Sequence, residues 1–131
     1  MFQAPGDNEW SAGKAIQPIK KRGGTAGARV KKSWERKGKS RSDFDIINAV
    51  QCFLNNDGKR DFTPHSMAIF SCSKRLENDL NAKQYQKIIT FGNIARDVII
   101  HLVKPLNYTP IVVTGLHPNG GVKNSDLDNL W

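Results

Sequence analysis

The sequence predicts a small, mainly α-helical domain with three helices, a short C-terminal strand and a disordered basic N-terminal arm. Three observations predict this class. Apolar residues recur at helical intervals between residues 42 and 103, a β-branched run follows them, and residues 1–41 have almost no apolar periodicity. A chain of 131 residues has room for one such domain.

The positive charge is confined to the first third of the chain. The formal net charge is +8, and residues 1–42 contain eleven Lys and Arg against three acidic residues. Residues 43–131 contain nine residues of each sign. This asymmetry is typical of an arm that binds a polyanion. Because glycine and proline are frequent in residues 1–41, we expect that arm to lack a fold of its own.

The first helix is expected from about residue 43 to residue 55. Ser42 supplies an N-cap hydroxyl and Asp45 follows three residues later, which is a variant of the capping box. Apolar residues then follow helical spacing until the Asn-Asn-Asp-Gly turn at 55–58. These apolar residues are Phe44, Ile46, Ile47, Val50, Phe53 and Leu54.

A second helix is expected after Thr63 and Pro64, which are typical of an N-cap and a first helical residue. Its apolar positions extend to Leu80 at roughly helical intervals. The apolar run at 67–73 is also compatible with a buried strand, because periodicity alone does not assign so short a run.

The longest helix is expected over residues 82–103, where one stripe is apolar and the opposite stripe is polar. Gly92 lies in the apolar stripe and costs this helix about 1 kcal/mol relative to alanine, and Pro105 stops it. The β-branched run from residue 108 to residue 114 then predicts a single short strand. An α+β, winged-helix-like arrangement is the alternative for these elements.

These expectations divide the chain into three parts: a basic flexible arm at 1–41, a helical globular domain at 42–114, and a C-terminal loop with an acidic-aromatic tip at 115–131. The arm carries the candidate nucleic-acid-binding residues, because Lys and Arg interleaved with Gly and Ser can follow a phosphate backbone without a fixed shape. These residues are Lys14, Lys20, Lys21, Arg22, Arg29, Lys31, Lys32, Trp34, Arg36, Lys37, Lys39 and Arg41.

Two aromatic features have two interpretations each. Trp34 lies in the densest basic stretch, where it would either stack on an exposed base or pack on the folded domain. The tip with Leu127, Leu130 and Trp131 would either dock a protein partner or fold back as a strap over its own core. The strap is favoured, because a tryptophan offers a large apolar surface to bury.

Catalytic and metal sites are not expected. Residues 33–40 end in Gly-Lys-Ser like a phosphate-binding loop, but the first glycine of that motif is absent and no strand precedes it. The cysteines and histidines lack the paired spacing of a zinc site. The sequence therefore predicts neither a metal nor a cofactor, and Cys52 and Cys72 are expected to be reduced thiols.

The function expected from these features is non-enzymatic binding of the nucleic-acid backbone, as in a coating, packaging or replication-associated protein of a virus or phage. The helical domain would mediate self-association or contact a protein partner. The alternatives are a helix-turn-helix regulator and a protein-interaction or matrix module that binds acidic membrane. DNA and RNA both fit.

The expected location is the cytoplasm, the nucleus or a virion. No segment approaches the roughly 18 apolar residues of a spanning helix, and no signal peptide is recognisable. We therefore expect neither secretion nor integral membrane association.

Overall fold

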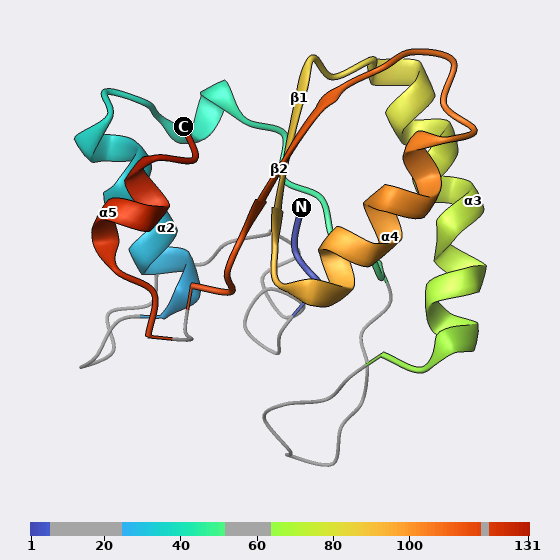
Figure 1. Ribbon diagram of the computed structural model, residues 1–131, viewed down its shortest axis with the longest axis horizontal. Coiled ribbons are helices and arrows are strands. Elements are labelled where there is room, and N and C mark those ends of the chain that lie inside the picture. Colours follow the sequence, from blue (N-terminus) through green and yellow to red (C-terminus); the bar gives the residue numbers. More distant parts are fainter. Residues whose placement is uncertain (6–24, 52–63, 119–120) are drawn as a thin grey trace.

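The computed structural model describes residues 1–5, 25–51, 64–118 and 121–131. In order, these residues form α2 (Ala26–Arg36), a 3-10 turn (Arg41–Asp43), α3 (Ser66–Lys83), β1 (Lys87–Phe91), α4 (Asn93–Val103), β2 (Ile111–Gly115) and α5 (Asn124–Asp128). Helices predominate, as expected, but a two-stranded sheet lies between them (Figure 1). The fold is therefore a mixture of α-helices with a small sheet.

The two regular strands are parallel, and α4 connects them. Lys87 lies opposite Ile111 and Phe91 lies opposite Gly115. Parallel neighbours need a long crossover connection, usually a helix, and α4 supplies it. The expected strand at 108–114 is thus present as β2, but it is paired rather than single.

Two further segments extend the sheet beyond β1. The Met1 amine donates to the Ile89 carbonyl, and the Phe91 N–H donates to the Met1 carbonyl. Phe2 in turn forms a parallel bridge with Asn48. We call the four segments at 1–3, 46–50, 87–91 and 111–115 the parallel layer.

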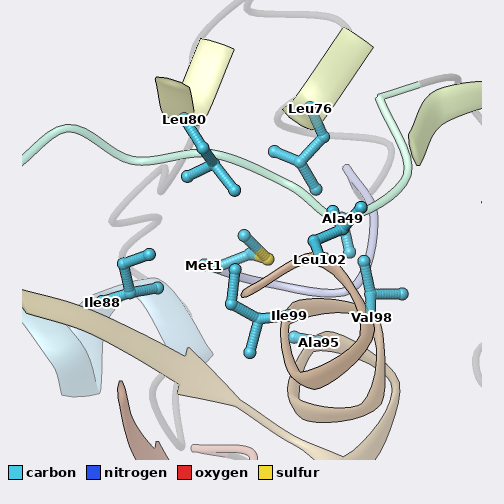
Figure 2. Packing of buried hydrophobic residues seen from close by; sticks show 9 residues of the cluster. All are labelled: Met1, Ala49, Leu76, Leu80, Ile88, Ala95, Val98, Ile99 and Leu102. Carbon is cyan, nitrogen blue, oxygen red and sulfur yellow. The ribbon is translucent and has the colours of Figure 1, made fainter. Parts of the chain in front are cut away.

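Side chains of the parallel layer alternate between two apolar cores, because successive residues of an extended chain point to opposite faces. On one face, α4 packs on β1 and α3 packs on α4. Figure 2 shows this first core, which contains Met1, Ala49, Leu76, Leu80, Ile88, Ala95, Val98, Ile99 and Leu102. The second core lies between the other face and the α2–α5 pair, and it contains Val30, Trp34, Phe91, Val122, Leu127 and Leu130.

The expected helix over 82–103 is wrong before Gly92, because residues 82–83 end α3 and Lys87–Phe91 form β1. Ile88 belongs to the first core, whereas Ile89 and Phe91 pack in the second core. This two-sided burial produced an apolar pattern that resembles a helical stripe. Gly92 then adopts φ 87 and ψ 166 and starts α4, so it is a boundary between two elements rather than an interior residue. The helix ends at Val103, before Pro105 as expected.

The expected helix from residue 43 is also wrong as far as residue 51. Ser40 and Asp43 form a capping box around a single 3-10 turn, with 2.7 Å from the Ser40 nitrogen to Asp43 Oδ2. The following residues are not helical, and Ile46 and Ile47 pack in different cores. Their burial on both sides again imitates helical spacing. Residues 52–55 lie outside the described residues.

The second expected helix is confirmed as α3, and the strand alternative at 67–73 does not occur. The N-cap is His65, whose Nδ1 accepts from the Met67 N–H at 3.3 Å. Thr63, the expected N-cap, lies outside the described residues. Within the part of the chain that the structure describes, no helix is both long and apolar enough to cross a membrane.

Of the expected N-terminal arm at 1–41, the structure describes residues 1–5 and 25–41. Residues 1–3 lie inside the parallel layer, and residues 26–36 form α2, whose Val30 and Trp34 are 1% and 3% exposed. Burial of these two side chains, one turn apart, packs the helix on the second core and stabilises it despite its many basic residues. Residues 6–24 lie outside the described residues.

The turn between β1 and α4 provides a test of the fold. Replacing Gly92 by alanine should lower the free energy of unfolding by about 1–3 kcal/mol, because only glycine readily adopts its backbone angles. Urea denaturation measures this difference. As a control, Gly38→Asn should cost less than about 1 kcal/mol, since Gly38 has φ 67 and open space around it. Equal losses for the two variants would contradict the assigned turn.

Candidate nucleic-acid interface

The basic helix α2 is built from one buried face and one charged face. Thr25 caps its N-terminus and accepts from the Ala28 N–H at 3.2 Å. Gly27, Val30, Ser33 and Trp34 form the buried face, which packs against α5 and the parallel layer. Lys31 and Lys32 are exposed outside this face.

Several of the expected nucleic-acid-binding residues have partners within the fold. Arg29 donates to the carbonyls of Pro118 and Val122. Arg36 forms a bidentate ion pair with Asp128, at 2.8 Å from Nε and 2.7 Å from Nη2. These two arginines join α2 to the C-terminal residues, so they have a structural role that the sequence did not indicate.

Two further basic residues have local partners. The Lys31 ammonium lies 3.7 Å from a Glu35 carboxylate oxygen one turn later in α2. Arg41 donates to the Phe44 carbonyl at 2.8 Å. Both contacts are exposed, and exposed pairs of this kind are worth little and exchange readily with solvent ions.

Three lysines remain on this surface whose side chains form no hydrogen bond or ion pair with any residue that the structure describes. They are Lys32, Lys37 and Lys39; their backbone N–H groups bond within the fold, but their side chains are exposed and make none of these contacts. We call them the lysine triplet. Lys14, Lys20, Lys21 and Arg22, the other basic residues expected to bind nucleic acid, lie outside the described residues.

Trp34 is buried, so its packing interpretation is the one observed. It is 3% exposed, stacks on Phe44 at 5.5 Å between ring centroids, and meets Trp131 edge-on at 6.2 Å. A side chain enclosed in this way cannot stack on a base without opening the second core. The densest basic stretch therefore places its aromatic residue inward and its lysines outward.

The C-terminal tip folds back on its own chain. Leu127 and Leu130 are 0% and 7% exposed within the second core, and Trp131 packs against that core. The Trp131 indole Nε1 donates to Ser33 Oγ at 2.7 Å. This is the strap arrangement, and we call residues 124–131 the C-terminal strap.

Asp128 is the polar link between the strap and α2. Besides the two bonds from Arg36, it accepts a hydrogen bond from Ser33 Oγ at 2.6 Å. Hydrogen bonds from Arg36 and then from Ser33 lower the pKa of Asp128 to about 2. The same contact raises the pKa of Arg36. Both groups are therefore charged throughout the neutral range.

A second candidate site lies where the parallel layer ends. All four of its segments run in the same direction, so their carboxyl ends meet along one margin, and we call this margin the carboxyl edge. Ligands of open parallel sheets bind outside this end of the strands. The residues that follow the strands here are Ala4, Pro5, Gln51, Gly92, Asn93, Leu116, His117 and Pro118.

The carboxyl edge brings His117 next to Gly92. A Cβ atom placed on Gly92 would lie 3.6 Å from the Cβ of His117, so the two loops touch. In the sequence, His117 was considered only as one of the histidines that lack the paired spacing of a zinc site. The sequence did not place His117 at this edge, because the residues of β1 were assigned to a helix. The β-branched run at 88–90, followed by Gly92, could have indicated a strand that ends here. Among the described residues, no group of three metal-ligating side chains forms a site.

The Asp128 link predicts a specific loss of stability in acid. A carboxyl whose folded pKa is lower than its unfolded value stabilises the fold above about pH 4, and this contribution disappears as the pH falls toward 2. Asp128→Asn should therefore be less stable than the wild type at pH 5, and the difference should vanish near pH 2. Denaturation with urea at each pH measures it. Asp126→Asn, an exposed position on the same helix, should keep the wild-type profile; the same change in both variants would refute the link.

No protein-family model matches this sequence, and neither does any of the curated proteins compared with it. The function of the chain must therefore be inferred from its own residues. The strongest evidence is the basic surface of α2, and the second is the carboxyl edge.

Proposed function

We propose that the protein binds nucleic acid through contacts between the phosphate backbone and its basic N-terminal third. The observation that carries this proposal is the confinement of the whole +8 charge to residues 1–42, while the rest of the chain is neutral. Lysine contacts with phosphates release condensed counterions and so favour binding without regard to sequence. A localised excess concentrates this effect on one part of the molecule.

The contacts within the fold reduce the number of charges available for phosphate. Arg29 and Arg36 have partners in the C-terminal region. Lys31 and Arg41 have local partners as well. The lysine triplet and the four basic residues that the sequence places at 14–22 then give seven side chains for phosphate contacts. At about 0.9 per phosphate contact, seven contacts predict a slope of about −6 for log K against log salt concentration.

The binding that we propose is sequence-independent, as in a coating, packaging or replication-associated protein. Backbone contacts fix the position of a protein on nucleic acid but do not identify bases. The buried Trp34 offers no stacking surface. The charge-balanced remainder of the chain also makes the helix-turn-helix alternative weaker.

A second candidate function is binding of a nucleotide unit at the carboxyl edge. It is favoured by the four parallel segments that end there, because this is where open parallel sheets hold their ligands. The first turn of α4 also points its backbone N–H groups toward this edge. The two candidates are compatible, since a strand held by the basic surface could present one nucleotide to the edge.

The lysine triplet gives the main proposal its test. Replacing Lys32, Lys37 and Lys39 by glutamine should make the salt slope shallower by about 2.7, because three phosphate contacts are removed. Fluorescence anisotropy with a labelled oligonucleotide, repeated over a range of salt concentrations, measures the slope.

The matched control removes three lysines from another surface. Glutamine at positions 74, 83 and 104 lowers the net charge by the same amount, and these side chains lie on or after α3 and α4. This variant should change the slope by less than about 0.5. Equal effects of the two triple variants would show that net charge, rather than the α2 surface, governs binding.

The carboxyl edge has a separate test by NMR. Adding each nucleoside monophosphate in turn should shift the backbone signals of residues 92–93 and 116–117, because the ligand would touch these loops. His117→Ala should weaken the response, whereas the triple glutamine variant of the lysine triplet should retain it. Shifts confined to α2 would argue against a ligand site at this edge.

A further inference from the structure

The contacts of Asp128 resemble a phosphate-binding arrangement. Its carboxylate accepts two parallel hydrogen bonds from the Arg36 guanidinium and a third, at 2.6 Å, from the Ser33 hydroxyl. A planar arginine fork with a neighbouring hydroxyl is a donor set that also suits a phosphate group. The chain therefore carries an anion site on α2 that is filled by its own side chain.

The two sides of this site differ in their access to solvent. Ser33 is fully buried, and its hydroxyl accepts a hydrogen bond from the Trp131 indole N–H, whereas the Arg36 side chain is 40% exposed. Lys32 and Lys37, both exposed, lie one turn before Arg36 and directly after it. A phosphate attracted by these lysines would thus approach Arg36 from its open side.

We propose that Asp128 withholds Arg36 from nucleic acid, and that the open side of Arg36 contacts a backbone phosphodiester when the negative charge of this carboxylate is removed. This inference rests on the proposed function. Asp128 is tethered to the same chain, so its local concentration at Arg36 exceeds that of any dissolved phosphate. The C-terminal strap would in this way reduce the number of phosphate contacts by one.

The strap is also held by contacts other than this carboxylate. Leu127 and Leu130 are buried in the second core, and the Trp131 indole bonds to Ser33. Apolar burial of this kind persists when a single carboxylate becomes an amide of the same shape. Asp128→Asn should therefore remove the charge that pairs with Arg36 while leaving the strap in place, which an unchanged near-ultraviolet circular dichroism spectrum would establish.

The experiment measures the affinity of the full chain for three labelled probes: a single-stranded DNA, a double-stranded DNA and an RNA. At 0.1 M salt, Asp128→Asn should bind about eightfold more tightly than the wild type, and its salt slope should be steeper by about 0.9, as one added contact requires. Asp126→Asn removes the same charge from the same helix and should stay within about twofold of the wild type.

A second pair of variants tests whether Arg36 is the group released. In an Arg36→Met background, adding Asp128→Asn should change the affinity by less than about twofold. If the wild type shows no salt-dependent binding to any probe, the proposed function fails and this inference fails with it. If the wild type binds but Asp128→Asn equals Asp126→Asn, the inference alone is overturned.

NMR tests the same contact in the unmodified protein. The Nε–H signal of Arg36 should keep its position when the oligonucleotide is added, because Asp128 continues to accept from it. The signals of Lys32 and Lys37 should shift in the same titration. A shift of the Arg36 signal equal to theirs would show that phosphate reaches Arg36 despite Asp128, and would overturn the inference without any variant.

Discussion

A parallel sheet is stable only when both of its faces are covered, and this requirement organises the molecule. On one face, α4 packs on the sheet and α3 packs on α4. The other face is covered by α2 and α5, which come from opposite ends of the chain and pack together. Because Phe91, Trp34 and Leu127 share the second core, the basic helix is a layer of the fold and not an appendage.

This use of α2 explains how its charges are distributed. A helix that must bury Val30 and Trp34 and also contact the C-terminal strap directs some arginines toward the protein. Arg29 and Arg36 satisfy carbonyls and a carboxylate there, whereas the lysine triplet remains in solvent. Arginine suits fixed, forked contacts and lysine suits mobile point-charge contacts, so the division follows the chemistry of the two side chains.

The sequence predicted elements where one physical signal acted alone. Local periodicity was enough to predict the helix that contains Leu80, and proline chemistry was enough to predict the helix end before Pro105. Apolar content was enough to predict the strand near residue 111 and the burial of the C-terminal tip. Helical spacing wrongly assigned residues 44–51 and 87–91 to helices, because the apolar pattern of segments buried on both faces resembles a helical stripe. The pairing of Phe2 with Asn48, the partners of Arg36 and the approach of His117 to Gly92 are long-range contacts that no local pattern encodes.

The proposed function requires this protein to hold the nucleic-acid backbone through localised positive charge. The most direct test is the affinity of the unmodified full chain for one oligonucleotide, measured over a fourfold range of salt concentration. With about seven phosphate contacts, the association constant should fall by nearly four orders of magnitude over that range. An association constant that does not change with salt, or the absence of binding at the lowest salt concentration, would contradict the claim.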